Sequence, residues 1–420
     1  MSDNHNHAFH RLHGPARRRI FYKKTDYADY LLMLALCAGV LWFSYAGARW
    51  LLGAGLLLCG FMAFSFPARH GVALTRPMLL HSARDVGYML FYKLQNMQPV
   101  FLVAVAVLAL DQLFIALTPD WPHHSALMAK LALALFYLHL VGISLYRLVI
   151  LGSHLRHRER VRAVLSETSW RGALEQQPSV TLHLAHACAT GLLTHLVLLA
   201  PWYLVITHVR YSVLSLLLIS VVNVLVHIFH LRGYSAWFYR EHWLAHNAEL
   251  DFVYLHGSHH DAIPCGLIGV SGNGFLEGFL RHTVGNPMSL YSPPLACLLH
   301  SLEVVQDIRM HQYIPGVFPS LGREFHEVSQ HSTHHFGRLE PYGIGLRLVR
   351  PEGAPRKQGW LGFPPESLLN SIALDEELNG FEWDNPRYQR FLAIYDKYQP
   401  QSEPKSESKP EPASAQEHQM

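Results

Sequence analysis

Long apolar runs separated by polar connections dominate the first half of this 420-residue chain. Six of the runs are as long as a membrane-crossing helix and contain few charged residues. The pattern therefore predicts an all-α, polytopic membrane protein with about six transmembrane helices within 27–231. The runs cover 27–48, 50–66, 98–118, 126–150, 182–206 and 211–231.

Basic residues are concentrated in every second connection. They precede the first run and fill the connections between the second and third runs and between the fourth and fifth, whereas the other connections are poor in Lys and Arg. By the positive-inside rule, the N-terminus, both long loops and everything after residue 231 face the cytoplasm. We expect a multi-pass protein of a bacterial inner membrane rather than of the endoplasmic reticulum, because the Ser/Pro/Glu-rich C-terminus has no retention signal.

The composition changes after residue 231. The stretch 232–350 mixes Gly, Pro, His and aromatic residues and is predicted to be a cytoplasmic helical cap. Within it, the apolar stretch 287–305 contains several prolines, which favours a re-entrant or interfacial segment over a seventh span. The remaining predicted units are a basic N-terminal arm (1–26), a cytoplasmic C-terminal extension (351–400) and a disordered tail (401–420).

Charge and cysteine content exclude several classes of protein. Charged residues make up 15% of the chain, against roughly 25% in soluble domains, and the net charge of +3 is too small for a nucleic-acid-binding surface. The five cysteines are scattered and form no CxxC motif, so neither a disulfide framework nor an iron–sulfur cluster is indicated.

A few polar residues lie inside the apolar runs. We interpret Arg147 and Asp111 as residues that snorkel or form pairs near helix ends. His183 and His186 share one face of the fifth run, and we do not favour them as substrate or redox contacts.

Histidine is the unusual residue of this sequence. The chain has 30 histidines, and nearly half of them lie between 227 and 335, where HWLAH, HGSHH and HSTHH form three boxes. Residues at i, i+3 and i+4 share a helix face, so each box can present several imidazoles together. The eight box histidines exceed the four ligands of a zinc site and suffice for two metal ions with open positions. They are His242, His246, His256, His259, His260, His331, His334 and His335.

A ligating imidazole usually donates its other N–H to a carboxylate or a carbonyl. Asp261 directly follows the second box and is the carboxylate that we expect in this role. His227 and His230 precede the first box, where they either line an entrance for substrate or mark a helix end at the membrane interface.

The HxxxH, HxxHH and distant HxxHH boxes after a multi-span apolar half resemble those of the fatty acid hydroxylase / sterol desaturase superfamily of integral-membrane di-iron enzymes. The closing HSTHHFGRLEPYG is similar to the last box of that family, with Pro341-Tyr342-Gly343 where an Asn-Tyr-Gly is frequent. The resemblance covers about 215–350. Family members often place a further histidine between the second and third boxes, and we favour His311 over the other candidates, which are His282, His300 and His326.

The resemblance implies a function and its cofactors. Two non-haem iron ions held by the boxes would use O2 to hydroxylate an unactivated C–H bond of a fatty acyl, sterol or related lipid, with no catalytic residue beyond the metal ligands. The chain has no haem, flavin or cysteine-cluster motif, so electrons are expected from an external donor of ferredoxin or cytochrome type and its reductase. A desaturase with the same di-iron site is one alternative. A histidine-rich metal transporter or sensor is another, and it predicts ionisable residues that face one another across several spans.

Overall fold

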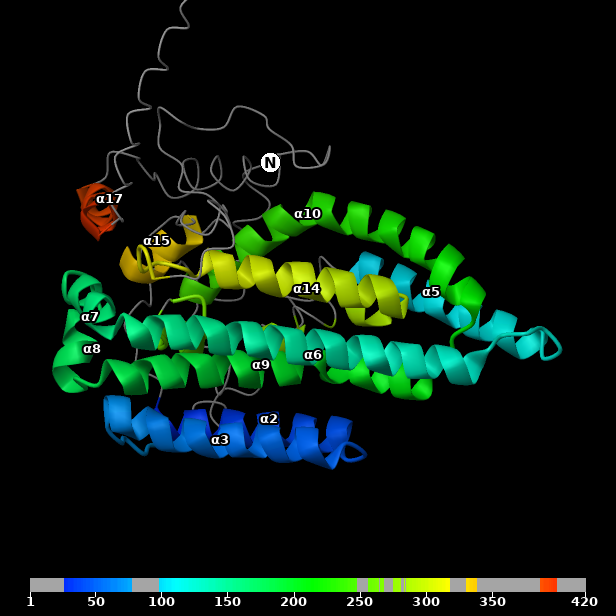
Figure 1. Cartoon of the computed structure of the whole chain (residues 1–420), viewed down its shortest axis with the longest axis horizontal. Coiled ribbons are helices and arrows are strands. Elements are labelled where there is room, and N and C mark those ends of the chain that lie inside the picture. The colour runs from blue at the N-terminus through cyan, green and yellow to red at the C-terminus, as the bar shows by residue number, and fades with distance from the viewer. Residues whose placement is uncertain are drawn as a thin grey trace, which may run out of the picture.

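A computed structural model of the chain describes residues 26–77, 98–247, 256–263, 265–267, 275–280, 283, 285–317, 330–337 and 386–398. The described residues are helical and contain no strand, which confirms the predicted all-α class. Figure 1 shows long helices packed side by side, with shorter helices gathered at one end. The long helices are α2 (Tyr27–Tyr45), α3 (Arg49–His70), α5 (Gln98–Leu117), α6 (Ser125–Arg156), α9 (Val180–His208), α10 (Ser220–Asn247) and α14 (Pro293–Met310). The short elements are α7 (Arg158–Ser166), α8 (Arg171–Gln176), η1 (Ser215–Ile219), α12 (Gly257–His260), α13 (Phe275–Leu280), η5 (Pro287–Leu290), α15 (Gln330–Gly337) and α17 (Pro386–Tyr398).

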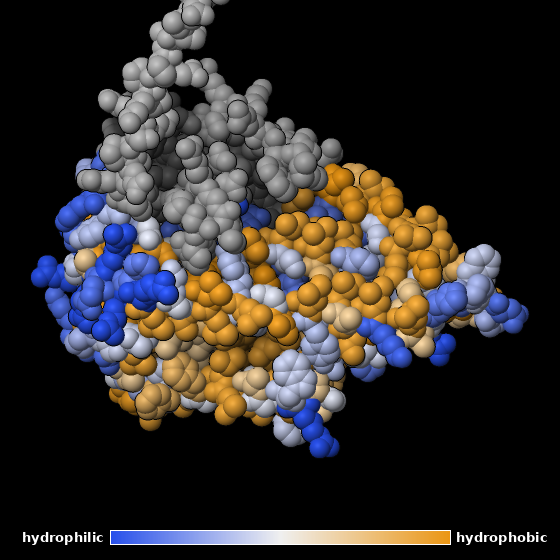
Figure 2. Space-filling model, viewed as in Figure 1, coloured by the Kyte–Doolittle hydropathy of each residue, from blue (hydrophilic) through white to orange (hydrophobic). Residues whose placement is uncertain are grey.

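Within the described residues, five helices are long and apolar enough to cross a membrane, and they correspond to the first five predicted spans. The sixth apolar run appears as a shorter stretch, Ser215–Leu231, within η1 and α10. A total of six spans therefore stays a prediction. Large apolar side chains such as Phe43, Leu57 and Leu138 are exposed on these helices, and Figure 2 shows a broad apolar surface with hydrophilic residues gathered at the α7–α8 end. Such a surface suits contact with lipid.

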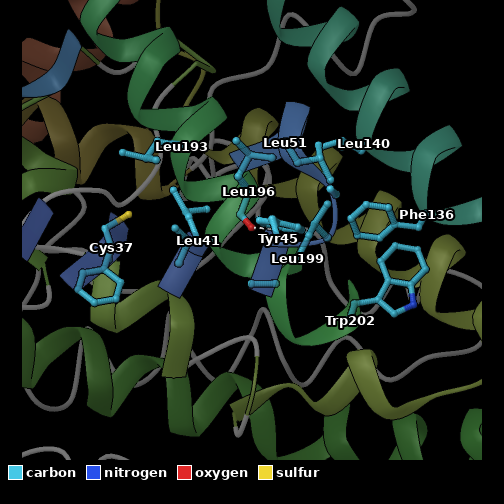
Figure 3. Packing of buried hydrophobic residues seen from close by; sticks show 14 of the residues in the cluster. Cys37, Leu41, Tyr45, Leu51, Phe136, Leu140, Leu193, Leu196, Leu199 and Trp202 are labelled. Carbon is cyan, nitrogen blue, oxygen red and sulfur yellow. Dashed lines mark hydrogen bonds between the residues drawn. The ribbon is translucent and has the colours of Figure 1, made fainter. Parts of the chain in front are cut away.

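Helix α9 lies at the centre of the bundle. It packs against α6 on one side and against α2 and α3 on the other, while α14 packs along α6 (Figure 1). The sequence explains this position because α9 is apolar or small around most of its circumference. Trp202 of α9 is fully buried with its ring 5.3 Å from that of Phe136, and the Tyr45 hydroxyl donates a 2.8 Å hydrogen bond to the Leu196 carbonyl (Figure 3).

Helix α10 continues without a break across the predicted boundary between 231 and 232. His227 and His230 are therefore not at a helix end, and that interpretation was wrong. His230 is buried, and the half-buried His227 lies 5.9 Å from the Tyr291 ring, measured between ring centroids. The same helix that contains the sixth apolar run thus carries the first histidine box.

The predicted re-entrant stretch 287–305 forms η5 and most of α14. Proline stands at the first helical position of α14, where its missing N–H costs no hydrogen bond. The helix contacts α6 and α10 and leads toward α15. The segment therefore packs beside the long apolar helices, as a re-entrant or interfacial segment would, although its depth in a bilayer stays a prediction.

The terminal units fall mostly outside the described residues. This holds for the basic arm 1–26 except its last residue, for 351–400 except α17, and for the whole tail 401–420. Helix α17 packs on α15, and its Lys397 ammonium donates a 2.6 Å hydrogen bond to the Glu167 carboxylate at the end of α7. The C-terminal extension thus contains at least one helix attached to the cap.

Candidate metal centre

Nine buried histidines gather at one end of the bundle, and they are the nine that the sequence analysis selected. They form two groups. Each histidine offers one imidazole nitrogen, and within a group these nitrogens all lie within 4.8 Å of one another. No ring in either group is more than 7% exposed. The five-histidine group consists of His242, His246, His256, His260 and His334, and the four-histidine group of His259, His311, His331 and His335.

Four segments that are distant in sequence supply these rings. The end of α10 carries His242 and His246, the short α12 and the residue before it carry the second box, and α15 carries the third. His311 directly follows the last residue of α14. Within α15, His331 and His335 are one helical turn apart and share a group. Neighbouring His259 and His260 point about 100° apart on a helix and belong to different groups.

The imidazoles meet through their Nε2 atoms. Nε2–Nε2 distances are 2.9 Å between His256 and His260 and between His246 and His334, both pairs within the five-histidine group. In the four-histidine group, His311 lies 2.9 Å from His259 and 3.0 Å from His331 by the same measure. In each of these contacts only one of the two Nε2 atoms can carry a proton, so the other presents a lone pair to the interior of the group. A cation is the partner that satisfies several converging lone pairs at once.

Among the described residues, each group consists of imidazole nitrogens alone, five in one group and four in the other. Imidazole is a suitable ligand for zinc, copper, iron and nickel.

The two groups adjoin each other. The ring of His260 in the five-histidine group stacks on that of His335 in the four-histidine group, with centroids 4.3 Å apart. His242 and His331 form a second contact between the groups at 5.0 Å. Two bound ions would therefore be neighbours, as in a dinuclear site.

Burial and mutual proximity favour the neutral form of three of these imidazoles. The pKa values of His260, His331 and His335 lie well below the ordinary histidine value, first because burial removes water from the charged form and second because other histidines surround them. Only a neutral imidazole has a lone pair for a metal, so the site is prepared for ligation at neutral pH.

Acceptors on the outer side orient two of the rings. The Nδ1 atom of His256 lies 2.9 Å from a carboxylate oxygen of Glu277, which is itself buried. His311 Nδ1 donates to the Asp307 carbonyl at 2.6 Å. Both contacts fix the ring and leave Nε2 for the metal. The contact shown for Asp261 is different, because its main-chain carbonyl accepts a hydrogen bond from Arg69. Its expected role as a carboxylate partner stays a prediction.

Glu277 was missed by the sequence analysis. It is the single charged residue of the short apolar helix α13, FLEGFL, and an isolated carboxylate in such a segment was the signal available. Of the alternative ligands, His282 and His326 lie outside the described residues. His300 belongs to neither group and stacks on Trp202 with centroids 5.1 Å apart.

Polar residues within the spans have specific partners. Arg147 is buried and donates to the Leu267 carbonyl at 3.0 Å, so the interpretation that it snorkels was wrong. Asp111 accepts a 3.0 Å hydrogen bond from the Ser215 hydroxyl, which confirms that it is paired. His183 accepts from Arg69 and His186 lies 2.8 Å from the Ser65 hydroxyl, so both have polar partners within the bundle.

Comparison of the chain with protein-family models, curated proteins and solved structures finds no match. The site is therefore characterised by its own geometry, which is that of a buried double cluster of imidazoles at the end of an apolar helix bundle.

Proposed function

We propose that this protein is a membrane-bound, O2-dependent di-iron hydroxylase that inserts oxygen into an unactivated C–H bond of a lipid. The observation that carries the proposal is the pair of adjoining histidine groups with Nε2 atoms about 3 Å apart. All-nitrogen donor sets with open positions suit redox-active iron better than structural zinc. The resemblance of the boxes to those of the fatty acid hydroxylase / sterol desaturase superfamily agrees with this chemistry.

Two iron ions bound by the histidines would supply the reduction of O2 and the oxidation of the C–H bond. Overall, one oxygen atom enters the product and the other leaves as water, so two electrons and two protons must be delivered. The protein contributes nine buried imidazoles and a setting that excludes bulk water. Glu277 and Asp307 hold the rings of His256 and His311 in position.

A lipid substrate is supported by the connection between the bundle and the histidines. Helix α10 leads from the apolar stretch Ser215–Leu231 to His242 and His246, and α14 leads from the bundle core to His311. Leu298 and Leu302 are exposed on α14, and Phe229 is exposed on α10. An acyl or sterol chain moving along these helices would keep apolar contacts until it reached the metal centre.

The proposal includes a cytoplasmic orientation in a bacterial inner membrane and an external electron donor of ferredoxin or cytochrome type. The orientation is supported by the distribution of basic residues, including the exposed arginines of α7 and α8 at the same end of the bundle as α15 and α17 (Figure 1). The five cysteines are all free thiols and four of them are buried, so they supply no redox cluster.

Metal and product analysis of the purified protein tests the proposal. We expect about two irons per chain and, with O2, an electron donor and a membrane lipid extract, a lipid product that has gained one oxygen atom. His259→Ala and His334→Ala each remove one ligand from a different group and should lose metal and product while the protein still inserts. His208→Ala is the matched control, because His208 is exposed at the far end of α9. Labile zinc without any oxygen-dependent product would contradict the proposal.

The desaturase alternative uses the same site and differs in its product. A desaturated lipid lacks two hydrogen atoms, whereas a hydroxylated lipid gains one oxygen atom. Lipid mass spectra of a deletion strain and its complemented strain distinguish these outcomes and identify the lipid class.

A metal transporter or sensor is favoured by one specific observation. His139, His195 and His300, from α6, α9 and α14, are buried and face one another within the bundle, with the rings of His139 and His195 4.9 Å apart. Among the described residues, however, these three do not form a metal-binding group. Transport predicts that His139→Leu abolishes metal uptake into vesicles, whereas the hydroxylase predicts that this variant retains both irons.

A further inference from the structure

We infer that two buried arginines of the membrane helices, Arg69 on α3 and Arg147 on α6, are positioning residues of the metal centre. The short segment 256–267 carries the second histidine box, and Arg69 contacts it near its middle, at Asp261, while Arg147 contacts its last residue, Leu267. The inference rests only on the metal-binding part of the proposed function, not on the oxygen reaction.

Arg69 binds the segment next to its histidines. Its guanidinium is 2% exposed, and its Nη2 donates to the main-chain carbonyl of Asp261, the residue that follows His260. Its Nε donates to His183 Nδ1 at 3.1 Å. Because that nitrogen accepts, His183 carries its proton on Nε2 and donates to the Gln177 carbonyl at 2.9 Å. The arginine is thus fixed by α9 on one side and holds the box on the other.

Arg147 binds the far end of the segment. Its Nη1 donates to the Leu267 carbonyl at 3.0 Å, and the side chain is 3% exposed. Gly191 of α9 makes room for this contact, because a Cβ atom there would lie 2.1 Å from the Leu267 oxygen and 2.6 Å from Arg147 Nη1. Between the two arginines, the Gly266 N–H donates to the carbonyl of His311 at 3.0 Å. The segment is therefore attached to α3 through Arg69, to α6 through Arg147 and to the main chain of His311, which belongs to the four-histidine group.

The segment depends on these attachments. Its only helix, α12, has four residues, too few to be stable without tertiary contacts. The segment nevertheless supplies His256 and His260 to one histidine group and His259 to the other. A small displacement of the segment would change the Nε2 positions in both groups at once. A guanidinium with several directed donors can hold a carbonyl while it remains bonded elsewhere, which a flexible ammonium does poorly.

The test measures iron binding rather than turnover. Arg69→Gln and Arg147→Gln are compared with Arg49→Gln and Arg156→Gln, which remove exposed arginines from the ends of the same two helices. We expect iron affinity, measured by equilibrium dialysis with elemental analysis, to fall by about tenfold or more for both ions in the first pair and to be unchanged in the second. Arg147→Lys should recover part of the affinity because it restores one donor to Leu267.

Local amide hydrogen exchange separates positioning from general destabilisation. In the metal-free variants, 256–267 should exchange faster while α6 and α9 keep wild-type protection. Gly191→Ala tests the same contact without removing a charge and should give the same iron deficit. Gly55→Ala is its control, because there the added Cβ meets only the flexible Leu41 side chain. Wild-type iron affinity together with wild-type protection of 256–267 in Arg147→Gln and Gly191→Ala would overturn the inference. A wild-type protein that binds no iron would instead refute the proposed function.

Discussion

The hydrogen bond between Glu277 and His256 provides a quantitative test of the metal centre. Glu277 is 5% exposed, and its carboxylate lies 2.9 Å from His256 Nδ1, on the side of the ring opposite the metal-facing nitrogen. A hydrogen bond to a charged group is worth about 1.5–3 kcal/mol, which corresponds to about a 10- to 100-fold change in affinity. Glu277→Gln keeps the shape and a weaker neutral acceptor, so we expect the lower value. Glu277→Leu removes the acceptor, so we expect the upper one.

The loss should be confined to one ion. His256 belongs to the five-histidine group, and the four-histidine group keeps all of its own outer contacts, including that of His311 with Asp307. An iron titration of Glu277→Gln should therefore show one site weakened about tenfold and one at wild-type affinity. Glu303→Gln is the control, because Glu303 is half-buried and likewise accepts a hydrogen bond, at 3.0 Å, but from Asn286. Unchanged binding of both ions in Glu277→Gln and Glu277→Leu would refute the reasoning.

Two further predictions concern the cap and the bundle core. Hydrogen bonds from Lys397 and Tyr398 hold the pKa of Glu167 below its ordinary value. These bonds therefore stabilise the docking of α17 fully above the ordinary carboxyl pKa, and this stabilisation is lost as the pH falls through the lowered pKa of Glu167. Protection factors of the α17 amides, which are corrected for the pH dependence of intrinsic exchange, should accordingly fall in acid in the wild type. Protection factors that do not change with pH would contradict this. In Lys397→Met they should be lower already at neutral pH. Trp202→Ala removes a fully buried ring packed on Phe136 and should lower the free energy of unfolding by about 3–5 kcal/mol. The loss should appear as a lower denaturation midpoint in detergent. An unchanged midpoint would show that the core is not packed as described.

The long apolar helices and the clustered histidines were predictable because each depends on local sequence. Length and apolarity are enough to select five membrane helices, and box spacing is enough to select histidines such as His242 and His246 on one helix. His311 was selected with help from the resemblance, since a lone histidine after an apolar stretch has no local signature. The structure brings it to the four-histidine group.

Features that depend on contacts between distant segments were not predictable. The division of each HxxHH box between two groups depends on how α12 and α15 face each other, which spacing does not determine. For Arg147, snorkelling and pairing near a helix end were both left open, because its partner, the Leu267 carbonyl, is 120 residues away. Glu277 was overlooked for the same reason, since nothing near it in sequence indicates His256.

The distribution of the nine ligands over four segments has a consequence for biogenesis. Neither histidine group is complete until α15 has been synthesised, because His334 belongs to one group and both His331 and His335 belong to the other. At about 5–20 residues per second, the ribosome needs several seconds to synthesise the stretch between the first box and α15. If the two groups bind iron as proposed, the metal should therefore be taken up only after α15 has been synthesised. A chain truncated before residue 330 is expected to accumulate in the membrane without metal, so iron content would report on completed synthesis.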